Sequence, residues 1–167
     1  MTIEAKLAGL FGLTDDNWMK HANPWSVATR YSVLPIIVLA FWSRIWIGWW
    51  CAVPAAVSLA WMFFNPVLFP RPASTRNWAS KSVLGERIWM NRKRVPVPDH
   101  HRRMPGLLNL ISAAGMALCI WAIVILSPWM AGLGTSLAYL GKSWYLDRMV
   151  WLFEDMKDHP EYGAWLY

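Results

Sequence analysis

The sequence predicts an all-α fold: a polytopic integral membrane helical bundle of about four transmembrane helices, with shorter interfacial helices, in a single membrane domain over residues 1–167. Three observations favour this fold. The chain is 56% hydrophobic and only 16% charged, whereas about a quarter of the residues in a soluble domain are charged. It contains 14 tryptophans, a residue that favours the bilayer–water interface. Long apolar stretches also alternate with a basic loop.

Residues 1–23 are predicted to form an interfacial N-terminal segment. Within residues 2–13, four apolar side chains share one face of a helix that is too short to cross a bilayer, so this helix should lie on the membrane surface: Ile3, Leu7, Leu10 and Phe11. Asp15 and Asp16 predict the start of a second short helix that ends at His21.

Residues 24–64 are predicted to form the first two spans. Asn23 is a good N-cap and Pro24 suits the first helical position, so a helix should begin at Pro24. One straight helix over this range would be about 60 Å long, twice the thickness of the hydrocarbon core. The turn is expected near Ser43 and Arg44, because an arginine at mid-membrane costs about 2.5–3.5 kcal/mol.

Residues 65–105 are predicted to form a basic loop with an amphipathic helix over residues 76–92. The loop contains nine Lys or Arg residues and two acidic ones, so the positive-inside rule places it, and both termini, on the cytoplasmic side of the membrane. Because the basic residues concentrate between apolar spans, anionic lipid headgroups are the expected partner and nucleic acid is not. The residues expected to contact headgroups are Lys81, Arg87, Arg92, Lys93 and Arg94.

Residues 106–157 are predicted to form the last two spans, followed by a tail over residues 158–167. Residues 107–131 carry no charge and are the clearest span in the chain. The glycines and threonine of Gly132–Thr135 are expected to turn the chain back. The last helix is then expected over residues 135–157.

The last helix carries the first candidate groups for chemistry. At 100° per residue, its polar side chains gather on one side: Ser136, Ser143, Asp147, Glu154 and Asp158. Carboxylates on a membrane helix should face the bundle interior or a watery cavity, because lipid exposure is costly. A functional role for Asp147 and a structural ion pair with Arg30 or Arg44 are equally compatible with this pattern.

Histidines are expected at the same membrane face as these carboxylates. His and carboxylate together suit iron, zinc or manganese and also general acid–base catalysis. The candidate catalytic residues are Asp147, Glu154 and His21, and the candidate metal ligands are His21, His100, His101, Asp147 and Glu154. Adjacent histidines on a regular element should point apart, and Asp155 is expected simply to be solvated. Neither a Glu-x-x-His nor a His-x-x-x-His pair occurs, so the sequence identifies no reaction and leaves open whether the chain is an enzyme.

Four short motifs carry a family resemblance. They are His21–Ser26 (HANPWS) followed by Thr29 and Arg30, then Asn77–Lys81 (NWASK), Gly85–Trp89 (GERxW) and Asp147–Trp151 (DRMVW). The chain resembles a family of small prokaryotic membrane proteins known only as a domain of unknown function. The resemblance covers nearly the whole chain and implies a multi-span membrane fold in a prokaryotic inner membrane. It implies no activity.

Three functions therefore stay open. The first is a membrane enzyme with a cytoplasm-facing His/carboxylate site, metal-dependent and acting on a hydrophobic substrate. The second is a small accessory or structural subunit of a larger membrane complex, or a homo-oligomer, packed through its tryptophans. The third is an ion or small-solute carrier that uses Asp147 and Glu154 as a polar path.

Overall fold

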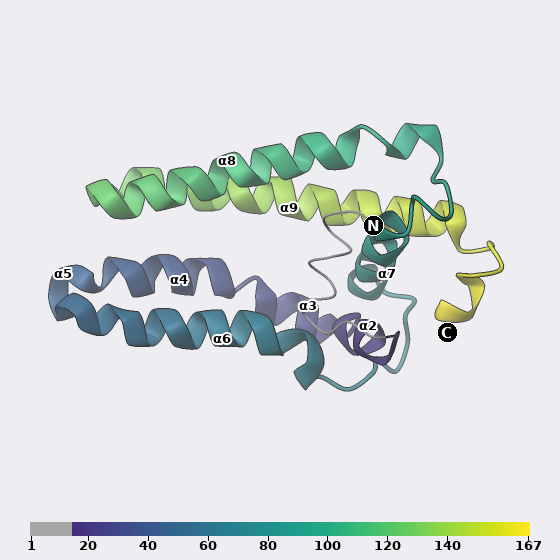
Figure 1. The fold of residues 1–167 in the computed structure, drawn as a ribbon, viewed down its shortest axis with the longest axis horizontal. Coiled ribbons are helices and arrows are strands. Elements are labelled where there is room, and N and C mark those ends of the chain that lie inside the picture. The colour runs from purple at the N-terminus through teal and green to yellow at the C-terminus, as the bar shows by residue number, and fades with distance from the viewer. Residues whose placement is uncertain (1–14) are drawn as a thin grey trace.

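A computed structural model describes residues 15–167, and every regular element within this range is a helix (Figure 1). The all-α prediction is confirmed for this part of the chain. The apolar helix expected over residues 2–13 lies outside the described residues. The helices form two long hairpins that lie side by side, with shorter helices gathered at one end (Figure 1).

The first hairpin consists of several consecutive helices. They are α2 (Asp15–His21), α3 (Pro24–Arg30), α4 (Val33–Trp42), α5 (Arg44–Ile47) and α6 (Ala52–Leu68), with the 3-10 helix η1 (Gly48–Cys51) before α6. The Asn23 side chain accepts a hydrogen bond of 2.9 Å from the Trp25 N–H, so α3 begins at Pro24 as predicted. The chain reverses at Gly48, a few residues after the expected position. Gly48 has a φ of 56°, which residues other than glycine rarely adopt, and this conformation allows the reversal.

The second hairpin pairs α8 (Met104–Ile125) with α9 (Pro128–Met156). The turn predicted at Gly132–Thr135 is wrong, because α9 already begins at Pro128 with Ser127 as its N-cap. Gly134 instead permits close helix packing: a Cβ atom there would lie 2.8 Å from the Cys119 backbone nitrogen. Small residues at this contact let the two backbones approach each other.

Helix α7 (Trp78–Met90) lies across the end of the hairpins and supplies much of the packed core. Its N-cap is Asn77, whose side chain accepts a 2.8 Å hydrogen bond from the Ser80 N–H. The structure confirms the helix predicted over residues 76–92, although α7 begins two residues later and ends two residues earlier. The core around α7 and α9 consists of fully buried apolar side chains, among them Leu84, Ile88, Met149, Leu152 and Phe153.

The opposite end of the hairpins is apolar but poorly buried. Two helical stretches, Pro24–Leu68 and Asp99–Ile125, are long and apolar enough to cross a membrane, with mean hydropathies of 1.7 and 2.2. Only 17% and 22% of their most apolar segments are buried, whereas the core helix of a soluble protein would be mostly buried. The protein thus has a packed, charged end and an apolar end that exposes hydrophobic side chains.

Candidate functional site

Two histidines and one aspartate meet at the packed end of the molecule. His100 and His101 lie on η2 (Asp99–His101), a 3-10 turn just before α8, and Asp155 lies on the last turn of α9. The Nε2 atoms of His100 and His101 lie 2.9 and 2.8 Å from the same Asp155 Oδ2 atom. This contact joins segments that are more than 50 residues apart in the chain.

The expectation that His100 and His101 point apart is wrong. Their ring centroids lie only 4.2 Å apart. The single 3-10 turn that carries them is too short to impose a regular pattern of side-chain directions, and both rings reach one carboxylate. His101 is 4% exposed and His100 is 67% exposed at the side chain, so the cluster has one buried and one accessible imidazole.

The cluster has the donor set of a transition-metal site. One ligand atom from each of the three residues lies within 4.8 Å of the others. Hydrogen bonds from His101 and then His100 hold the pKa of Asp155 below its usual value, so this carboxylate is ionised at neutral pH. Two imidazoles and a carboxylate suit zinc or ferrous iron and leave coordination positions open for water or a substrate.

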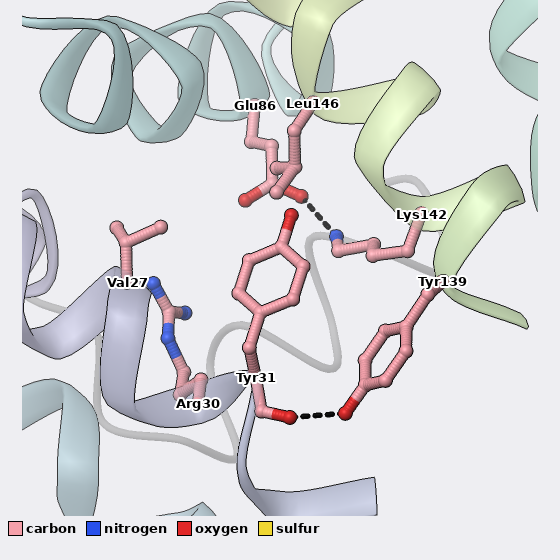
Figure 2. A pocket seen from close by; sticks show the side chains of 7 residues that line it. All are labelled: Val27, Arg30, Tyr31, Glu86, Tyr139, Lys142 and Leu146. Atoms are coloured by element: carbon pink, nitrogen blue, oxygen red, sulfur yellow. Dashed lines mark hydrogen bonds and ion pairs between the residues drawn. The ribbon is translucent and has the colours of Figure 1, made fainter. Parts of the chain in front are cut away.

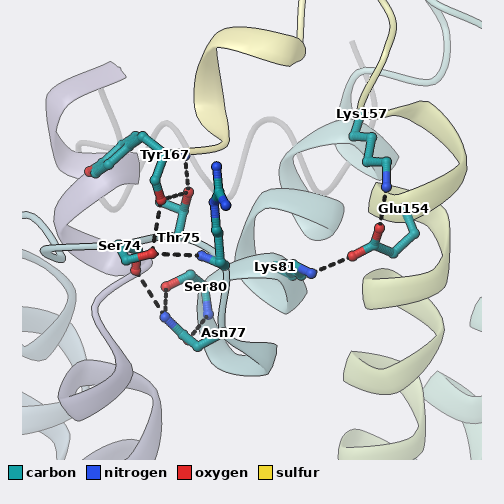
Figure 3. A network of polar contacts seen from close by, with 9 residues as sticks. Ser74, Thr75, Asn77, Ser80, Lys81, Glu154, Lys157 and Tyr167 are labelled. Atoms are coloured by element: carbon teal, nitrogen blue, oxygen red, sulfur yellow. Dashed lines mark hydrogen bonds and ion pairs between the residues drawn. The ribbon is translucent and has the colours of Figure 1, made fainter.

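The predicted carboxylates Asp147 and Glu154 do not lie in this cluster. Glu154 accepts hydrogen bonds from Lys81 at 2.5 Å and from Lys157 at 2.9 Å (Figure 3). The hydrogen bond from Lys81, followed by the one from Lys157, lowers the pKa of Glu154 below its usual value. Asp147 accepts a 3.2 Å hydrogen bond from the Trp78 indole N–H. Both carboxylates therefore link α7 to α9 or brace α9 itself, and their catalytic and metal-binding roles stay predictions.

His21 lies in another place, buried beside Arg30. The Arg30 Nη1 atom lies 2.7 Å from His21 Nε2, and an imidazole that accepts from a guanidinium must be neutral. Burial, followed by the positive charges of Arg30 and Lys142, lowers the pKa of His21 well below its usual value. His21 therefore stays uncharged at neutral pH, away from the pair formed by His100 and His101.

A second polar site lies between α3, α7 and α9 (Figure 2). We call it the inter-hairpin pocket; its cavity volume is about 130 Å³, and it is lined by Val27, Arg30, Tyr31, Glu86, Tyr139, Lys142 and Leu146. Glu86 is only 9% exposed, and its carboxylate accepts a 2.6 Å hydrogen bond from Lys142. Sequence reasoning did not select Glu86, although it is the lone acidic residue in the basic helix α7.

The basic residues expected at lipid headgroups are mostly engaged within the protein. Lys81 pairs with Glu154, Arg87 with Asp15, and Arg94 with Glu161 at 2.6 Å. Arg92 lies over the Trp89 ring at 4.3 Å, and Lys93 is exposed. Their contact with headgroups stays a prediction.

The C-terminal segment is tied to the loop before α7. The Thr75 N–H donates to the Tyr167 carbonyl at 2.9 Å, and the Tyr167 N–H donates to Thr75 Oγ1 at 2.9 Å (Figure 3). These bonds hold the end of the chain against α7, which also packs on α9. The C-terminal segment, α7 and α9 are therefore packed together at the end of the molecule that carries the histidine–aspartate cluster.

Comparison with known proteins gives a family but no activity. No curated protein and no solved structure matches the chain. Residues 2–165 match a family of unknown function, DUF6653. That match spans almost the whole sequence, in agreement with the resemblance carried by the four motifs. The chain therefore belongs to the DUF6653 family.

Proposed function

We propose that this chain crosses a membrane four times and binds a divalent transition-metal ion at the cytoplasmic end through His100, His101 and Asp155. The two hairpins of Figure 1 would supply the four crossings. Helix α8 has 22 residues and is therefore about 33 Å long, enough for a hydrocarbon core of about 30 Å.

The tips of both hairpins carry exposed aromatic residues, which supports this placement. Trp49 is 93% exposed at the first tip and Trp129 is 89% exposed at the second, and the two tips lie at the same end of the molecule (Figure 1). Indole rings at this level fit a membrane–water interface. Arg44 at the first tip donates to the Ile123 and Val124 carbonyls at 2.6 and 3.1 Å, which satisfies the open end of α8.

The basic loop supports a cytoplasmic location for the packed end. Single cysteines placed at Lys93 and at Trp49, after Cys51 and Cys119 are replaced by alanine, test this orientation in inverted and right-side-out vesicles. A membrane-impermeant maleimide should label position 93 from the cytoplasmic side and position 49 from the other side. Labelling of both positions from one side would contradict four crossings.

The metal site rests on one observation, the approach of two imidazoles and one carboxylate from separate segments to within 4.8 Å. Three protein ligands leave positions open at which the ion can polarise a bound carbonyl or phosphoryl oxygen, or lower the pKa of bound water. The exposed His100 gives access from the aqueous side. A metal-dependent reaction on a membrane-borne substrate is the activity that this arrangement supports best.

Metal titration of the detergent-purified protein tests this site. After removal of bound ions with a chelator, zinc, ferrous iron and manganese should bind with a stoichiometry near one for at least one ion. His101→Ala and Asp155→Asn should weaken binding at least tenfold while thermal unfolding still shows a folded protein. His159→Ala is the matched control, because His159 contacts the Glu161 N–H and Tyr162 outside the cluster. Equal binding by all variants would contradict the assignment.

The accessory-subunit and carrier functions stay predictions. An accessory subunit should co-purify with a defined partner and should tolerate Asp155→Asn without loss of its role. A carrier should show ion flux in proteoliposomes that disappears in Asp147→Asn.

A further inference from the structure

The inter-hairpin pocket lies where the apolar helices give way to the charged end. Arg30 ends α3, and the apolar helix α4 follows it after two residues. Lys142 is the first charged residue along α9. The two cations thus mark the same boundary on both hairpins, a level at which long basic side chains reach lipid headgroups in membrane proteins.

The pocket combines apolar walls with an excess of positive charge. Val27 and Leu146 supply aliphatic surface, and the rings of Tyr31 and Tyr139 stack with centroids 5.5 Å apart. Glu86 neutralises one of the two cations through its bond with Lys142. Arg30, Lys142 and Glu86 together give the lining residues a formal net charge of +1, which favours an anion.

Arg30 has donors available for such an anion. Its described hydrogen bonds run from Nε to the Ser26 carbonyl at 3.1 Å and from Nη1 to His21. A guanidinium has five N–H donors in a planar fork that matches carboxylate and phosphate oxygens. The contacts with Ser26 and His21 fix the position of the Arg30 side chain, so little side-chain entropy is lost when an anion binds.

We propose that the inter-hairpin pocket binds the anionic head group of an amphiphile, a carboxylate or phosphate, between Arg30 and Lys142. A volume of about 130 Å³ holds a head group but not a hydrocarbon chain, so the chain would continue along the apolar hairpins into the bilayer. The inference rests on the membrane placement proposed above and is independent of the metal site. Lys142 and Asp155 are 13 residues apart on α9, about 20 Å along the helix.

Equilibrium binding to the intact detergent-solubilised protein, with chelator present, tests the proposal. The probes are radiolabelled palmitate, phosphatidylglycerol, phosphatidylcholine and inorganic phosphate. Palmitate and phosphatidylglycerol distinguish a carboxylate from a phosphate head group, and at least one should bind tenfold tighter than phosphatidylcholine. Inorganic phosphate should bind weakly, because it lacks the chain; phosphate binding as tight as that of either amphiphile would overturn the proposal.

Three charge substitutions separate binding in the pocket from general adsorption. Arg30→Gln removes the excess charge and should weaken amphiphile binding at least tenfold. Glu86→Gln raises the net charge and should tighten binding several-fold, a direction that mere destabilisation would not produce. Arg71→Gln, in the loop before α7 and paired with Asp16 outside the pocket, should leave binding unchanged.

Even if Arg30→Gln fails to fold, the direction in which Glu86→Gln changes amphiphile affinity tests whether binding takes place in the inter-hairpin pocket. Unchanged or weaker binding in folded Glu86→Gln protein would overturn the proposal. So would equal losses in Arg30→Gln and Arg71→Gln. A failed metal titration would leave these results standing, because the chelator keeps metal out of the binding assay, and the vesicle labelling separately tests the membrane placement.

Discussion

Replacing Gly85 by alanine should separate α7 from α9 and destabilise the packed end. A Cβ atom at Gly85 would lie 1.9 Å from the Met149 carbonyl oxygen and 2.5 Å from its carbon. Because atoms at this contact need at least 3.0 Å, the two helices must move apart by about 1 Å. The obstacle is backbone and cannot rotate away, so we expect a cost of about 3 kcal/mol, the upper part of the range for overpacking.

The same movement should disturb the ion pairs between the two helices. Glu86 and Lys81 contact Lys142 and Glu154 at 2.6 and 2.5 Å, and a shift of about 1 Å would take both beyond normal hydrogen-bond length. Unfolding in mixed micelles with a denaturing detergent, followed by circular dichroism, measures the free energy of unfolding.

Gly106→Ala is the control for Gly85→Ala. Gly106 lies in the first turn of α8, and a Cβ atom there would meet nothing within 4 Å. Alanine should therefore leave stability unchanged or raise it by up to about 1 kcal/mol through its higher helix propensity. A Gly85→Ala protein as stable as Gly106→Ala would refute the close approach of α7 and α9.

Two further predictions concern protons and metal. Burial holds the pKa of His21 well below 6.5, so as pH falls through about 6.5 the unfolded chain binds a proton at His21 and the folded chain does not. The free energy of unfolding should therefore fall by up to about 1.4 kcal/mol per pH unit. Unfolding of His21→Gln measured over the same pH range should lack this decrease. Zinc at a hundred times its dissociation constant should raise the free energy of unfolding by about 2.7 kcal/mol, and the same measurement on His101→Ala should show almost no increase.

The helices could be predicted largely from apolar length and capping residues. Asn23 and Pro24 marked the start of α3, and the amphipathic pattern of residues 76–92 marked α7. The turn between α8 and α9 was misplaced because Gly134 was interpreted as a turn residue, although its role is close helix packing. Ser127 followed by proline was the better signal, because it combines an N-cap with a favoured first helical residue.

The candidate site was only partly predictable. The sequence indicated that His100 and His101 lie at the same membrane face as the carboxylates of the last helix, but it could not indicate which carboxylate they meet. The side chains of Glu154 and Asp155 leave α9 in directions about 100° apart. Lys81 and Lys157 already donate hydrogen bonds to Glu154. The path of the loop between α7 and α8 therefore selects Asp155, and that path depends on contacts between distant segments.

X-ray absorption of the metal-loaded protein shows directly whether His100, His101 and Asp155 bind the ion. With zinc bound, the spectrum should show two imidazole ligands at about 2.0–2.1 Å and further oxygen ligands at about 2.0–2.2 Å. His101→Ala should reduce the imidazole count to one, and His159→Ala should leave it at two. A spectrum of hydrated zinc, or an imidazole count unchanged in His101→Ala, would contradict a metal site formed by His100, His101 and Asp155.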